Sequence, residues 1–158
     1  MDMSGEYRIS APRIAVWEAL NDAAILKVCI PGCEEISWTS PTGLEAVVVQ
    51  KIGPVKARFA GVIEILNINA PLSYTIRGEG KGGVAGFAKG SADVSLHDEN
   101  GETVLSFVVR AQVGGKLARL GSRLIDSTAK KVANRFFGNF CEYLNKEEAA
   151  ASGETKAL

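Results

Sequence analysis

Apolar and polar residues alternate along the middle of the chain in the way that is typical of β-strands. Glycine, proline or asparagine separates one alternating segment from the next, so consecutive strands are expected to pair antiparallel through tight turns. A short strand near the start of the chain precedes these segments. The predicted strands cover residues 4–10, 35–39, 44–51, 55–69, 72–76, 88–97 and 103–113.

A helical period replaces this alternation in three places. Residues 12–20 and 23–28 predict two short helices, the first opened by Pro12 and the second capped by Asn21-Asp22. Residues 116–145 predict one long amphipathic helix. The predicted order is therefore a strand, two short helices, a run of strands and a long C-terminal helix.

This order predicts an α+β fold, in which a curved antiparallel sheet of about six or seven strands wraps around the long helix. The apolar stripe of the helix must be buried, and the sheet is the element available to bury it. At 158 residues, the chain is expected to form one domain. We expect that domain to span residues 1–146, followed by a disordered tail over residues 147–158.

The net charge of the chain argues against one class of partner. The chain has 18 basic and 18 acidic residues and no basic stripe, so nucleic acid is not an expected partner. Basic residues recur along the long predicted helix, where we interpret them as a solvated face; a docking face for an acidic partner or lipid headgroups is the alternative. They are Arg119, Arg123, Lys130, Lys131 and Arg135.

The cysteine and histidine content predicts neither disulfides nor a metal site. Cys29 and Cys33 flank Ile-Pro-Gly, Cys141 is distant in sequence, and His97 is the one histidine. The two neighbouring cysteines cannot close a structural zinc site by themselves, and His97 is distant from them in sequence. An odd number of cysteines suits a reducing compartment. Residues 1–6 do not resemble a signal peptide, and no segment is long and apolar enough to cross a membrane. A cytoplasmic protein is expected.

Glycine recurs in residues 78–83, Gly-Glu-Gly-Lys-Gly-Gly, which fits the pattern of a dinucleotide-binding turn. That interpretation requires a helix directly after the glycines, whereas residues 84–88 continue a β pattern. We therefore interpret the segment as a strand–turn–strand whose glycines allow sharp curvature.

Catalytic groups are not evident. His97 lies beside a predicted hairpin turn, and the acidic residues fall on polar faces or near turns, so no catalytic set can be assembled. The chain is not expected to be an enzyme. Tyr74 and Gln112 are the polar residues that an enzymatic alternative would use.

The inner face of the predicted sheet and helix is apolar and also rich in glycine and alanine. Small residues on both sides of a wide sheet leave a volume that a ligand can fill, although a plain hydrophobic core is the alternative. The candidate ligand-binding residues are Phe59, Ile63, Tyr74, Ile76, Phe87, Phe107, Val109, Leu117, Leu120 and Leu124.

Several segments together resemble the G-subunit family of carbon-monoxide dehydrogenase. They include Cys29-Ile30-Pro31-Gly32-Cys33, Gly53-Pro54-Val55-Lys56-Ala57 and Gly114-Gly115-Lys116-Leu117-Ala118. The resemblance covers residues 3–143 and implies the START-like, helix-grip fold. It implies an accessory protein of a molybdenum-containing aerobic carbon-monoxide dehydrogenase, or of a related molybdenum hydroxylase, and supplies no catalytic residue.

The same resemblance implies an apolar, lipid- or quinone-like ligand between sheet and helix. No cofactor is expected beyond such a bound lipid or quinone. It further implies a role in membrane recruitment or electron hand-off, with peripheral contact at the inner face of the cell membrane. Two alternatives stay open, a START-like enzyme of the cyclase or hydrolase type and an assembly factor without a ligand.

Overall fold

The structure is a computed structural model that describes residues 1–157, with side chains described for residues 1–147. Its strands are β1 (Asp2–Ile9), β2 (Cys33–Ser40), β3 (Gly43–Ile52), β4 (Val55–Asn69), β5 (Ser73–Lys81), β6 (Phe87–Glu99) and β7 (Glu102–Gly114). Its helices are α1 (Arg13–Leu20), α2 (Ala23–Cys29) and α3 (Ser122–Ala157), with short 3₁₀ helices η1 (Gly83–Ala85) and η2 (Gly115–Leu120).

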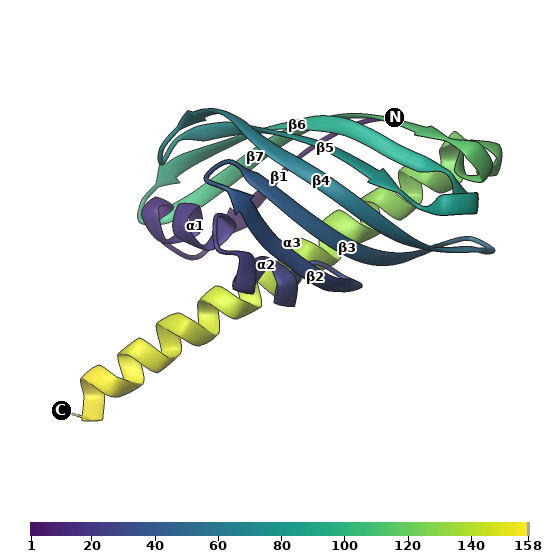
Figure 1. The fold of residues 1–158 in the computed structure, drawn as a ribbon. Coiled ribbons are helices and arrows are strands. Elements are labelled where there is room, and N and C mark those ends of the chain that lie inside the picture. The colour runs from purple at the N-terminus through teal and green to yellow at the C-terminus, as the bar shows by residue number, and fades with distance from the viewer. Residues whose placement is uncertain (158) are drawn as a thin grey trace.

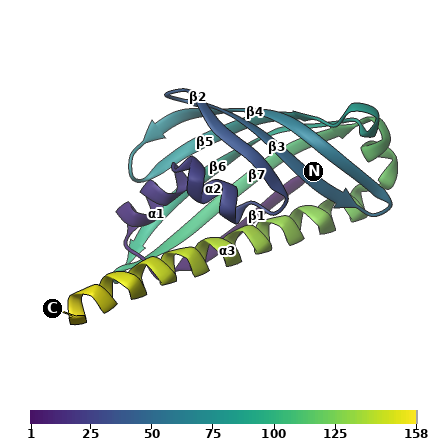
Figure 2. The same ribbon diagram turned by 60° about the horizontal axis from the view of Figure 1, so that its bottom comes forward.

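The seven strands form one antiparallel sheet in the order β1-β7-β6-β5-β4-β3-β2. The sheet curves over α3, which runs along its open side and continues past its edge (Figures 1 and 2). α1 and α2 lie together near the end of the sheet where α3 leaves it (Figure 1). This arrangement confirms the predicted curved sheet around a long C-terminal helix.

Local sequence accounts for the turns and helix starts. The Asp22 carboxylate caps α2 by accepting hydrogen bonds from the Ala24 and Ile25 amides, at 2.9 and 3.3 Å. Between β6 and β7, Asn100 and Gly101 both have positive φ, which suits a tight hairpin turn. The glycine-rich segment forms the end of β5 and the first residue of η1, and β6 follows from Phe87, as the strand–turn–strand interpretation predicted.

The long helix differs from its predicted range at both ends. η2 occupies residues 115–120, Gly121 has a φ of 88°, and α3 begins at Ser122 instead of Lys116. The helix then continues to Ala157, through the segment in which a disordered tail was predicted. The side chains from residue 148 onward lie outside the described residues.

The main hydrophobic core lies at the end of the sheet where α1 and α2 pack. Its fully buried side chains come from strands and helices together, among them Ile9, Val16, Leu96, Leu105 and Phe140. Asn139 of α3 fixes the end of α2 here, since its Nδ2 donates a 3.0 Å hydrogen bond to the Cys29 carbonyl. This end of the molecule is therefore held by large interlocking side chains.

Candidate functional site

A cavity of about 590 Å³ lies between the inner face of the sheet and the first turns of α3. We call it the main cavity. Across β4, β5 and β6, its sheet side is a row of small residues, because Gly61 pairs with Gly80 and Gly80 pairs with Ala88. Its helix side includes Ala129 and Ala133. Protein interiors normally pack without such gaps, so the cavity results from the small size of these lining side chains.

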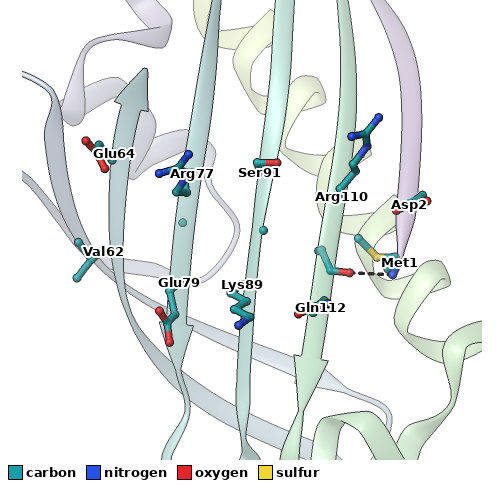
Figure 3. Close-up of a pocket in the computed structure, with 13 residues that line it drawn as sticks. Met1, Asp2, Val62, Glu64, Arg77, Glu79, Lys89, Ser91, Arg110 and Gln112 are labelled. Atoms are coloured by element: carbon teal, nitrogen blue, oxygen red, sulfur yellow. Dashed lines mark hydrogen bonds between the residues drawn. The ribbon is translucent and has the colours of Figure 1, made fainter. Parts of the chain in front are cut away.

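The lining of the main cavity is almost entirely hydrocarbon. Two side chains with polar groups, Gln50 and Thr128, line it, and both already donate hydrogen bonds within the protein. Gln50 Nε2 donates to the Pro31 carbonyl at 2.7 Å, and Thr128 Oγ1 donates to the Leu124 carbonyl at 2.9 Å. Glu79 also borders the cavity, but its side chain projects from the outer face of β5 (Figure 3). Such a lining suits an uncharged, apolar molecule.

A second cavity of about 260 Å³ adjoins the main cavity on the side of α1 and α2. Ile30, Ile63 and Phe136 line both cavities and therefore form the partition between them. The second cavity is also lined mostly by apolar residues, and its lining side chains with polar groups are those of Asn21, Trp38 and Tyr74.

Tyr74 is the most deeply buried of these three side chains. Its side chain is only 5% exposed and packs edge-on against Trp17, with ring centroids 5.2 Å apart. Among the described residues, none forms a hydrogen bond with the Tyr74 hydroxyl. Burial raises the pKa of Tyr74 well above its ordinary value, so the hydroxyl stays protonated and is available as a donor.

Seven of the ten candidate residues line a cavity. Phe59, Val109 and Leu117 line the main cavity, and Ile63 lines both. The remaining three of the seven, which line the second cavity, are Tyr74, Ile76 and Phe107.

The other three candidates lie elsewhere. Phe87 is 37% exposed and lies on the outer face, where it pairs with Gly114 and has the Lys89 ammonium 6.0 Å from its ring centroid. Leu124 faces Gly53 in the β3–β4 turn, and Leu120 ends η2 without lining either cavity. Phe87 faces outward because side chains alternate along β6, and residues 88, 90 and 92 of this strand face inward.

Sequence reasoning missed the helix side of the main cavity. Its lining comes from one stripe of α3 at helical spacing, namely Ile125, Thr128, Ala129, Val132, Ala133 and Phe136. The predicted lining lay one to two turns too early, because the helix was expected to start at Lys116. Gly121 was the available signal, since a glycine there breaks the helical period.

A hollow of about 740 Å³ lies on the outer face of the sheet (Figure 3). Opposite charges face each other across neighbouring strands here: Glu64 pairs with Arg77, Glu79 with Lys89, and Asp2 with Arg110. Such cross-strand pairs stabilise a solvated sheet face. The hollow is open and its charges are balanced, so it offers no distinct ligand chemistry.

One end of the molecule carries unbalanced positive charge, and we call it the basic end. The β3–β4 turn packs against α3 there, and η1 packs against η2. No Asp or Glu lies within residues 51–56, 81–87 or 115–123, and no basic side chain of these segments forms an ion pair with a described residue. Val84 projects from this end with 85% exposure. Its basic residues are Lys51, Lys56, Lys81, Lys116, Arg119 and Arg123.

Within the part of the chain that the structure describes, no three His, Cys, Asp or Glu side chains gather as a metal site. The described helices include none that is long and apolar enough to span a membrane. Cys29 is buried, and burial raises the pKa of its thiol, which makes it an unreactive packing residue.

A curved antiparallel sheet gripping a long C-terminal helix, with an apolar cavity between them, defines the START-like, helix-grip class. Solved structures share this fold: a conserved protein from Geobacillus kaustophilus superposes with a TM-score of 0.87 at 28% identity, covering 92% of this chain and 96% of that one. The model of the CoxG family, the G subunits of carbon monoxide dehydrogenase, matches residues 5–145, and the chain belongs to this family.

More distant structures show the same fold. A START superfamily protein from Mycobacterium smegmatis has a TM-score of 0.70 at 11% identity, covering 92% of this chain and 97% of that one. The Zhui aromatase/cyclase from Streptomyces sp. R1128 has a TM-score of 0.68 at 12% identity, covering 96% and 97%. No curated protein matches the sequence.

Proposed function

We propose that this CoxG-family protein carries an uncharged, lipid- or quinone-like molecule in its main cavity and does not catalyse a reaction. The observation that supports this proposal is the lining of the main cavity, about 590 Å³ bounded by hydrocarbon with no side chain placed for acid–base chemistry. Burial of apolar surface contributes roughly 25 cal/mol per Å², so such a cavity favours an apolar ligand over water.

Blocking the cavity tests this proposal directly. The substitution Ala129→Trp places an indole in the main cavity and should abolish binding of an apolar fluorescent probe such as Nile red. Ser127→Trp is the matched control, because Ser127 is exposed on the same helix and does not line the cavity. Equal probe binding by both variants and the wild type would contradict a cavity-bound ligand.

We further propose that the protein serves a molybdenum-containing carbon-monoxide dehydrogenase, or a related molybdenum hydroxylase, as an accessory protein. Membership of the CoxG family supports this partner. In this role the protein and its ligand would help to recruit the enzyme to the membrane or to hand its electrons on. A pull-down with the purified dehydrogenase at low salt should retain the enzyme, and a negative result there would count against the partnership.

The basic end supports the membrane part of this proposal. Six Lys and Arg residues lie there in segments that contain no Asp or Glu, although the chain as a whole is electrically neutral. Clustered basic residues are attracted to the anionic inner leaflet of a membrane, and an exposed apolar side chain such as Val84 strengthens this contact. Residues at this end, among them Leu117 and Ile52, line the main cavity, so a docked protein would bring the cavity close to the bilayer.

A further inference from the structure

The hydroxyl of Tyr74 has no hydrogen-bond acceptor among the described residues, and it is not among their fully enclosed polar atoms, so a molecule in the second cavity can reach it. A ligand that displaces water from this hydroxyl must supply an acceptor, because a buried polar group without a hydrogen bond costs free energy. Tyr7 shows the ordinary arrangement in the same molecule, since its hydroxyl donates to Asn134 Oδ1. Tyr74 is more deeply buried than Tyr7, yet none of the described residues accepts its proton.

The surroundings of Tyr74 provide room for an acceptor that belongs to another molecule. Tyr74 lines the second cavity, whose volume of about 260 Å³ accommodates a small polar end group. The side chains of Ile30, Ile63 and Phe136 line both this space and the main cavity, so the two cavities adjoin. An elongated ligand can therefore place its hydrocarbon body in the main cavity and one end beside Tyr74.

The lining also restricts the charge of that end group. The residues of the second cavity include no Lys, Arg, His, Asp or Glu, so a buried carboxylate, phosphate or ammonium would lack a partner. A neutral oxygen that accepts one hydrogen bond meets the requirement. Ketones, quinones, esters and alcohols qualify, whereas a free fatty acid in its ionised form does not.

We propose that the second cavity is the subsite for the polar end of the ligand, where the Tyr74 hydroxyl donates a hydrogen bond to a neutral carbonyl or hydroxyl oxygen. This inference rests on the proposed function, because it requires that the main cavity holds the body of the same ligand. It adds the chemical class of the ligand and the residue that selects it.

The test compares two probes that differ in one oxygen. One is the fluorescent naphthyl ketone prodan, and the other is its alkyl analogue with a methylene group in place of the carbonyl. Tyr74→Phe should weaken prodan binding by about three- to tenfold, which corresponds to one hydrogen bond. The alkyl analogue should bind both proteins equally. Bound prodan should also emit at shorter wavelength in the variant, because its carbonyl loses a donor.

Tyr7→Phe is the matched control, since it removes a tyrosine hydroxyl that is already paired and lies outside both cavities. It should leave the preference for the ketone unchanged. Equal effects of Tyr74→Phe on both probes, or no effect on either, would overturn the inference while leaving the cavity itself intact. Failure of the alkyl analogue to bind the wild type would instead overturn the proposed function, and this inference with it.

Discussion

The two halves of the space between sheet and helix are filled very differently. Near α1 and α2, aromatic side chains stack: the Tyr7 and Phe137 rings lie 4.1 Å apart, and those of Phe136 and Phe140 lie 5.7 Å apart. We call this the aromatic half. Towards the basic end, the same strands and helix present Gly61, Gly80 and other small residues around the main cavity. We call that the glycine half.

The main cavity arises from the small volume of its lining side chains and not from a change of backbone. The strands β4 to β7 and the helix α3 pass through both halves, so the scaffold is shared. Most of the fully buried large side chains lie in the aromatic half, around the smaller second cavity, so we expect stability to come mainly from this half. Space for a ligand resides in the glycine half. Substitutions that exchange the character of the two halves should therefore have opposite effects.

The largest effect is expected from emptying the aromatic half. Phe140 is completely buried, and Phe140→Ala should lower the free energy of unfolding by about 3–5 kcal/mol. The matched truncation in the glycine half is Val132→Ala, which enlarges an existing cavity and should cost about 1 kcal/mol or less. Urea unfolding measures both values, and equal losses would remove the distinction between the halves.

Enlarging one alanine in each half should give a smaller difference in stability between the two halves. Ala19 is 3% exposed within the aromatic half, so Ala19→Leu should overpack this half and lower the free energy of unfolding by about 1–3 kcal/mol. Ala129→Leu adds the same atoms to the main cavity and should be neutral or stabilising. Thermal unfolding of the ligand-free proteins checks this pair. A comparable loss in Ala129→Leu would show that the glycine half has no free volume.

The sequence predicted some elements of the fold and of the main cavity better than others. Alternation and turn residues were sufficient for the antiparallel pairing of consecutive strands from β2 to β7 and for the two short helices, but not for the pairing of β1 with β7. The glycines and alanines at positions 61, 78 and 88 indicated an underfilled interior. Phe87 could not be placed, because its face depends on how the residues between β5 and β6 set the register of β6.

The helix side of the site was less accessible to sequence reasoning. Leu117, Leu120 and Leu124 fit a helical stripe, but η2 and Gly121 interrupt the helix and shift its lining residues towards the C-terminus. The second cavity was not predicted at all. It depends on how α1 and α2 pack over the sheet, a long-range arrangement that local periodicity does not determine.

The smallest expected effect concerns the surface that borders the glycine half. Arg119→Gln combined with Arg123→Gln removes two charges from the basic end, and each lost charge should lower binding to anionic vesicles by about fivefold. Co-sedimentation with phosphatidylglycerol-containing vesicles at low salt measures this. Lys27→Gln combined with Lys146→Gln removes the same charge outside the basic end and should change binding little. Equal losses would show that binding follows net charge and not the basic end.

Native mass spectrometry of the purified wild-type protein beside Ala129→Trp is the most direct test of the central claim, that the glycine half holds a ligand. We expect the wild type to retain one neutral, oxygen-bearing apolar molecule per chain, released by organic solvent and identifiable in the extract. The Ala129→Trp protein should fold and lack that mass. A wild type that carries no such molecule and acquires none from a lipid extract would contradict the claim.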